Sequence, residues 1–122
     1  MKPNDADFEV HKQKVYSYMG LAMRAGKLVS GEESTEKAVK NGSAKLVIVA
    51  LDASDNTKKL FKDKCSFYGI PVEIFGYMHE MGHALGKEKR ASLAFLDKGL
   101  ADATCKQLIL AMNSGGSNNV KN

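Results

Sequence analysis

The stretch Lys45–Leu51, KLVIVAL, is rich in β-branched residues, and after Lys45 every residue is apolar. A strand with one face in water alternates between apolar and polar side chains, whereas a strand covered on both faces does not. The stretch therefore predicts a central β-strand buried on both faces, and we expect the rest of the fold to form around it.

Helical and strand patterns alternate downstream of this stretch. The periodicity predicts helices over 56–68, 78–85 and 98–112 and strands over 72–75 and 91–96. Ser54 or Asp55 is the expected N-cap of the first of these helices. The strand over 72–75 is expected to be a second core strand. The closing helix is expected to turn four side chains inward, namely Leu100, Ala103, Leu108 and Ile109.

Two helices are predicted upstream. Apolar residues recur at helical spacing over 10–25, and Gly26 ends that helix. A short extended piece follows at 28–29. Ser30 is expected to open the second helix, with Glu33 at capping-box spacing, and this helix should run to about 41–42.

This alternation predicts the α/β class, with a three-layer α/β/α sandwich around a small mixed sheet of about four strands. The 122 residues are enough for one core. We expect residues 10–112 to form a single domain and residues 1–9 a flexible N-terminus. Residues 113–122, rich in Gly, Ser and Asn, are expected to be a disordered tail.

The composition favours contacts with phosphate. Lys and Arg total 18 against 14 Asp and Glu, a formal net charge of +4, and Arg24 and Arg90 are the only arginines. Lysine suits single contacts to phosphate better than bidentate reading of a base. Cys65 and Cys105 are too few for a disulfide framework and are expected to be reduced core residues. Neither a signal peptide nor a membrane-crossing run is visible, so we expect a cytoplasmic protein without a membrane partner.

His79-Glu80-Met81-Gly82-His83 matches the H-E-x-x-H signature of zinc peptidases. On a helix the two histidines would share one face, and Glu80 could activate a zinc-bound water. However, Gly82 weakens so short a helix by about 1 kcal/mol, and no third ligand is evident. We therefore expect a surface helix with two solvated histidines, and no metal, cofactor or catalytic set. A zinc hydrolase is the alternative interpretation.

Basic residues gather in two segments. Arg24 and Lys27 precede the second helix and Lys37 and Lys40 lie on it, while Lys87, Lys89 and Arg90 cluster in a later loop. The start of the helix offers free backbone N–H groups and the positive end of the helix dipole, which favour a bound phosphate. Solvated lysines on an ordinary surface would give the same pattern, so charge alone leaves both interpretations open.

Two sequence motifs carry a resemblance to a known family. The first is G-x-A-K-L-V-I-x-A-x-D over 42–52, and the second is M-G-x-A-x-G over 81–86. With these motifs the chain resembles the ribosomal-protein L7Ae/L30e family, which binds kink-turn RNA, and within it the bacterial YlxQ-type branch. The resemblance covers about residues 12–110 and implies a three-layer α/β/α sandwich. It also leaves both histidines of the zinc-like string outside the fixed positions of the second motif.

The resemblance implies that RNA meets the loop leading into the second helix and the loop after Gly86. The candidate RNA-binding residues are Lys27, Ser30, Gly31, Glu32, Glu33, Ser34, Lys37, Lys87, Lys89 and Arg90.

The chain departs from the family pattern at two places. Kink-turn readers carry an Asn-Glu pair where this sequence has Glu33 and Ser34, and a carboxylate at Glu33 cannot donate to a base edge. The family also places small apolar residues where this chain has the charged stretch 87–90. We therefore expect RNA binding with more electrostatic and less kink-turn-specific character.

The expected function is that of a non-catalytic, monomeric protein whose partner is structured RNA. Ribosomal RNA and kink-turn-like RNA are the candidates, and we expect an association with ribosomes or translation. One alternative is a protein–protein interaction module that has lost RNA binding. Glu32, Glu33 and Glu36 favour it, because they place acidic groups beside the expected phosphate site.

Overall fold

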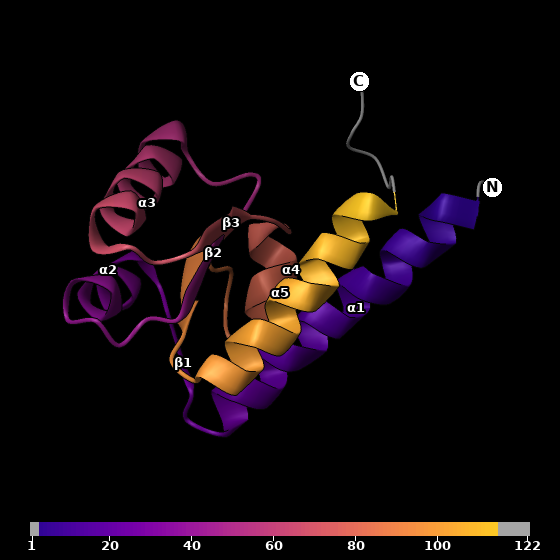
Figure 1. The fold of residues 1–122 in the computed structure, drawn as a ribbon, viewed down its shortest axis with the longest axis horizontal. Coiled ribbons are helices and arrows are strands. Elements are labelled where there is room, and N and C mark those ends of the chain that lie inside the picture. Colours follow the sequence, from indigo (N-terminus) through magenta and orange to yellow (C-terminus); the bar gives the residue numbers. More distant parts are fainter. Residues whose placement is uncertain (1–2, 115–122) are drawn as a thin grey trace.

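Helices and strands alternate along the chain in the computed structural model, which describes residues 3–114 (Figure 1). The predicted order of elements is confirmed, and so is the α/β class. The elements are α1 (Pro3–Arg24), β1 (Leu28–Ser30), α2 (Glu32–Lys40), β2 (Leu46–Val49), α3 (Asp55–Tyr68), β3 (Val72–Ile74), α4 (Met78–Leu85), β4 (Ser92–Phe95) and α5 (Lys98–Asn113).

The strands form one mixed sheet of order β1-β4-β2-β3. β2 pairs parallel with β3 and antiparallel with β4, and β4 pairs antiparallel with β1. All four residues of β2 are buried, as the stretch Lys45–Leu51 predicts. Helices α2 and α3 cover one face of the sheet, and α1, α4 and α5 cover the other (Figure 1). The three-layer sandwich is therefore confirmed.

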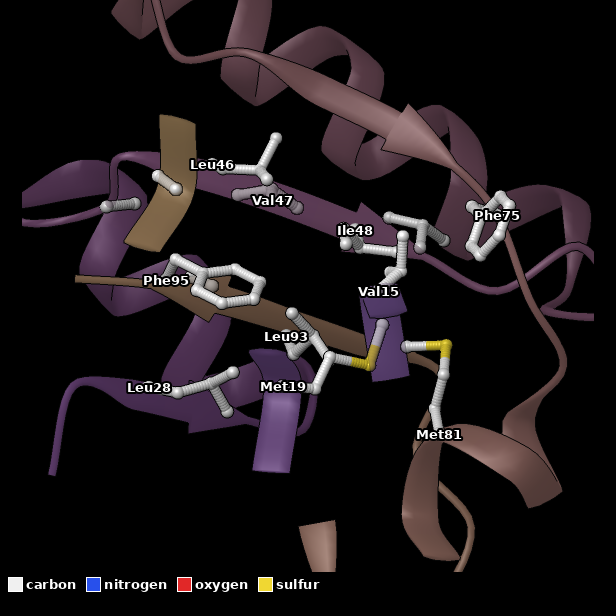
Figure 2. Packing of buried hydrophobic residues seen from close by; sticks show 14 of the residues in the cluster. Val15, Met19, Leu28, Leu46, Val47, Ile48, Phe75, Met81, Leu93 and Phe95 are labelled. Atoms are coloured by element: carbon white, nitrogen blue, oxygen red, sulfur yellow. The ribbon is translucent and has the colours of Figure 1, made fainter. Parts of the chain in front are cut away.

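The core joins the sheet to the α1 and α4 layer. Figure 2 shows the side chains of Met19, Ile48, Met81, Leu93 and Phe95 gathered there. Each of these side chains has 0% of its surface exposed. Complete burial of such a side chain contributes about 1.5–3 kcal/mol to folding, so this cluster fixes the positions of α1 and α4 on the sheet.

The first helix begins earlier than predicted. α1 starts at Pro3 rather than near Val10, and proline is favoured in the first turn because that position needs no backbone N–H. Asn113 is the last residue of α5, and the predicted tail beyond Ser114 lies outside the described residues. Among residues 3–114, no helix combines the length and hydrophobicity needed to cross a lipid bilayer.

Two predictions about burial are wrong. The strand over 72–75 is not a second core strand, because β3 lies at the edge of the sheet and its three residues are only half-buried. Ile109 is 57% exposed rather than inward-facing. It lies about 100° around the helix from buried Leu108, and the buried face of α5 consists of Ala101, Thr104, Leu108 and Ala111.

Candidate nucleic-acid interface

Helix α2 begins at a glycine rather than at the predicted serine cap. Gly31 is the N-cap, with φ 94° and ψ 155°, a conformation that glycine adopts freely and other residues do not. Ser30 is the last residue of β1 and pairs with Leu93, and its hydroxyl accepts a hydrogen bond from Arg90 Nε at 3.0 Å. The predicted capping box of Ser30 and Glu33 is therefore wrong, because strand pairing fixes Ser30 before the helix starts.

The first turn of α2 has no side-chain cap within the described structure. Its residues Glu32, Glu33 and Ser34 are exposed, and the Thr35 N–H donates to the Gly31 carbonyl at 2.9 Å. The preceding N–H groups and the positive end of the helix dipole favour an anion at this point. The two glutamates stabilise the same end of the helix through their own charge.

Arg90 ties the loop 87–90 to the start of α2. Its Nε donates to Ser30, and its Nη1 donates to the carbonyls of Glu88 at 3.4 Å and Lys89 at 3.2 Å. The side chain thus holds the loop backbone and the β1–α2 junction at once. Arg90 is half-buried, so it shapes the surface in addition to contributing charge.

Gly82 of α4 lies under this loop and is buried. A Cβ on Gly82 would overlap the carbonyl oxygen of Glu88 and come within 2.8 Å of Lys89 Cα. The loop backbone therefore packs directly on the Cα of Gly82. This contact explains why the motif M-G-x-A-x-G carries a glycine inside so short a helix.

The structure brings most of the sequence-predicted residues to one surface. Ser30 and Arg90 are in direct contact, and Gly31 follows Ser30 at the helix start. The others are exposed on the first two turns of α2 or on the loop, and they are Glu32, Glu33, Ser34, Lys37, Lys87 and Lys89.

Lys27 is the exception, because it lies at the opposite end of β1. Its carbonyl accepts a hydrogen bond from the Leu96 N–H at 2.8 Å, and its Nζ is 3.9 Å from Asp97 Oδ1, just before α5. The length of β1 separates Lys27 from Gly31. The structure therefore does not bring Lys27 to the other candidate residues.

A buried pair of hydroxyl groups positions α2, and the sequence does not single it out. Ser92 on β4 and Thr35 on α2 are both 0% exposed, and Ser92 Oγ donates to Thr35 Oγ1 at 3.4 Å. The Ser92 carbonyl also accepts the Gly31 N–H at 2.9 Å. Buried polar groups are normally paired in this way. In the sequence Ser92 interrupts an apolar strand pattern, whereas Thr35 stands among polar residues and gives no signal of burial.

The string from His79 to His83 forms a surface helix with two exposed histidines, as predicted. Glu80 is already engaged, because its Oε1 accepts from the Tyr16 hydroxyl at 2.7 Å and its Oε2 lies 3.6 Å from Lys12 Nζ. Burial and the bond to Glu80 raise the pKa of Tyr16 above its usual value. Within the described part of the chain, no group of three His, Cys, Asp or Glu side chains could hold a metal ion.

Both cysteines are free thiols. Cys65 is fully buried in α3, which confirms its predicted core position, while Cys105 on α5 packs only partly against the core. Burial raises the pKa of Cys65 to about 11 and also raises the pKa of Cys105. Because the thiolate is the reactive form, neither side chain is suited to act as a nucleophile.

The sandwich fold and the glycine-packed loop beside α2 define a class of small three-layer α/β domain. The model described as "Ribosomal protein L7Ae/L30e/S12e/Gadd45 family" matches residues 13–105, and the chain belongs to this family.

Individual relatives confirm the resemblance to the YlxQ-type branch. The RNA-binding protein YlxQ of Enterococcus faecium is 46% identical over 102 residues, which cover 83% of this chain and 96% of that protein. The RNA-binding protein YlxQ of Bacillus subtilis is 41% identical over 87 residues, covering 71% and 87%. A solved structure of a Bacillus halodurans protein of unknown function is 41% identical with a TM-score of 0.76, and the match covers 79% of this chain and 97% of that one.

Proposed function

We propose that this protein is a non-catalytic RNA-binding protein that recognises structured RNA through the first turn of α2 and the loop 87–90. The hydrogen bond from Arg90 to Ser30 carries the proposal, because it joins segments 60 residues apart into one surface. Backbone N–H groups on α2 and lysines on the loop suit the phosphate contacts that position RNA. The names of the Enterococcus and Bacillus relatives support an RNA ligand.

The exposed cations of this surface are Lys37, Lys87 and Lys89. Within residues 6–114, whose side chains the structure describes, none of the three forms an ion pair with a carboxylate. Unpaired lysines are free to meet phosphates, and such contacts release counterions from the RNA. Affinity should therefore fall steeply as the salt concentration rises.

Kink-turn RNA is proposed as one ligand, recognised mainly through its shape. Glu33 is exposed and does not cap its own helix, so its carboxylate is free to accept hydrogen bonds from base amino groups but cannot donate any. The charged loop 87–90 offers phosphate contacts in place of an apolar surface for a flipped-out base. Both features favour contacts with the RNA backbone over contacts with the edges of its bases.

We further propose that the RNA is ribosomal or associated with translation, and that the protein binds it as a monomer in the cytoplasm. The family description, which begins with ribosomal proteins, supports the ribosomal part of this assignment.

Fluorescence anisotropy tests the proposal, with the purified protein, a kink-turn RNA and a plain RNA duplex at low and moderate salt. We expect both RNAs to bind, with a modest preference for the kink-turn that survives added salt. The variant Lys37→Gln/Lys89→Gln should bind about tenfold more weakly, because two phosphate contacts are lost. A matched control, Lys62→Gln/Lys106→Gln on the exposed surfaces of α3 and α5, should stay within about twofold of the wild type.

Equal affinities of the two double variants would contradict the assigned surface. Binding of neither RNA by the wild-type protein would contradict the function and favour a protein-docking module. For that alternative the acidic surface is small, because Glu36 is already engaged by Lys40 at 3.5 Å and Lys64 at 3.7 Å. Partners that persist in a pull-down from RNase-treated lysate would then identify the docking role of Glu32 and Glu33.

A further inference from the structure

A groove of about 670 Å³ lies between α1 and α4 and is also lined by Lys87, Glu88 and Lys89 of the loop 87–90. It belongs to the face of the sheet opposite α2, since α1 and α4 share one layer (Figure 1). The two helices approach closely at Gly20, where a Cβ would come within 3.0 Å of the Ala84 carbonyl oxygen. Because no side chain stands at this point, the helix backbones approach each other there and polar side chains surround the hollow.

Three cations line the groove, namely Arg24 in the last turn of α1 and Lys87 and Lys89 on the loop. Arg24 Nη1 lies 3.2 Å from the Cβ position of Gly20, so the guanidinium lies over the close approach of the two helices. Among the described side chains, those of residues 6–114, no carboxylate lies within ion-pair distance of any of these three cations. Their charge is therefore available to a ligand.

The two carboxylates of the groove do not cancel this charge. Glu80 is bound to the Tyr16 hydroxyl and lies next to Lys12, which lies outside the groove lining and balances its charge. Glu88 is then the one carboxylate of the groove lining whose charge offsets part of that of the three cations. The groove therefore carries a net positive charge.

Further polar side chains complete the lining. Gln13 and Ser17 come from α1, and His79 and His83 come from α4. Amide, hydroxyl and imidazole groups are the side chains that bond to phosphate oxygens and ribose hydroxyls in RNA complexes. This mixture of cations and polar donors suits a polyanionic backbone better than an apolar small molecule.

We propose that the α1–α4 groove binds the phosphodiester backbone of a double-stranded RNA stem that flanks the segment held at α2. The inference rests on the proposed function and extends it to a second surface. The loop 87–90 connects the two, because Arg90 reaches Ser30 on one side while Lys87 and Lys89 border the groove on the other. A stem leaving the α2 surface can thus cross the loop and continue between α1 and α4.

Two kink-turn RNAs test the inference by anisotropy, one with short stems and one with a flanking stem lengthened by one helical turn. The variant Gln13→Glu/Arg24→Gln changes only exposed groove residues outside the α2 surface. We expect it to bind the long-stem RNA about tenfold more weakly than the wild type, with a salt slope smaller by about one. Its affinity for the short-stem RNA should stay within about twofold. Lys62→Gln/Ser66→Glu on α3 makes the same charge change on the opposite face and should bind both RNAs like the wild type.

Unchanged affinity of the groove variant for the long-stem RNA would overturn the inference and leave the proposed function standing. An equal loss of affinity for the long-stem and short-stem RNAs would also overturn the inference, because it would reflect the lower net charge of the variant rather than contacts in the groove. Failure of the wild-type protein to bind either RNA would instead reject the proposed function, and the groove inference with it.

Discussion

Gly82 and Gly31 act at the scale of single residues to set the two backbone segments of the candidate interface. The loop 87–90 occupies the space that a side chain on Gly82 would need. The positive φ of Gly31 lets the chain leave β1 and enter α2 without an intervening loop. Gly82 therefore determines how closely the loop 87–90 packs on α4, and Gly31 determines the direction in which α2 leaves β1.

The substitution Gly82→Ala should displace the loop backbone, because the added methyl group overlaps the Glu88 carbonyl. We expect the free energy of unfolding to fall by about 2 kcal/mol. RNA affinity should fall as well, since Lys87 and Lys89 move with the loop. Urea unfolding and anisotropy measure the two effects.

Gly99→Ala is the matched control, because Gly99 is also a helical glycine. Its added Cβ would meet only the end of the Asp97 side chain, at 3.3 Å. The change in unfolding free energy should stay below about 1 kcal/mol, since the gain in helix propensity offsets a small shift of Asp97. Similar losses in both variants would contradict a special role of the loop contact at Gly82.

The local sequence predicts the role of one N-cap candidate correctly and that of another wrongly. Ser54 is the N-cap of α3, as predicted, and accepts a hydrogen bond from the Thr57 N–H at 3.1 Å. Ser30 carries the same local signal, yet it is held by Leu93 and Arg90, which lie far along the chain. A contact of such sequence separation leaves no trace in a window of a few residues.

At the scale of elements, the pairing of α1 with α4 depends on two polar contacts of Glu80, with Tyr16 and with Lys12, beside an apolar contact. The Tyr16 hydroxyl donates to Glu80 at 2.7 Å, and Met19 and Met81 pack in the core next to it. Through this pairing the walls of the groove keep their spacing.

Tyr16→Phe removes the hydroxyl and leaves the ring in place. We expect the free energy of unfolding to fall by about 1 kcal/mol, the size of a hydrogen bond to a partly exposed carboxylate. Thermal unfolding followed by circular dichroism is the measurement. The control is Tyr18→Phe, which removes the hydroxyl of a half-buried tyrosine on the same helix. Its free energy of unfolding should fall by less than half as much. Equal losses would show that the hydrogen bond to Glu80 contributes nothing beyond the ring.

The order of the elements follows from the sequence because each helix and strand has its own periodicity. β2 is the clearest case, since its unbroken apolar run requires cover on both faces. The edge position of β3 and the exposure of Ile109 do not follow, because they depend on which neighbour lies beside each element. Apolar character alone does not distinguish the edge of a sheet from its centre.

At the scale of the whole molecule, the structure bears on the zinc alternative. The side chains of residues 6–114 contain no cluster of three metal-ligating groups, and Glu80 is engaged by Tyr16 and Lys12. We expect purified protein to carry less than about 0.1 zinc per chain. Its melting temperature should be the same with and without a chelator. One zinc per chain that survives dialysis, with a lower melting temperature after chelation, would restore the hydrolase interpretation.

The two proposed RNA surfaces differ in how far the sequence could predict them. The surface at α2 was predicted through family-like motifs, although the structure places Lys27 elsewhere. The groove was not, because Gln13 and Arg24 meet Lys87 only after the sandwich has formed. Neither α1 nor the loop 87–90, which together line the groove, has a composition that would by itself indicate an RNA site.

The strand order has a consequence for how the chain is made. β4 is the last strand to be synthesised, yet it lies inside the sheet between β1 and β2, and it is the sole pairing partner of β1 within residues 3–114. A nascent chain that ends before Ser92 therefore cannot form the complete four-stranded sheet. β1 can therefore join β2 and β3 in one sheet only after β4 has been synthesised.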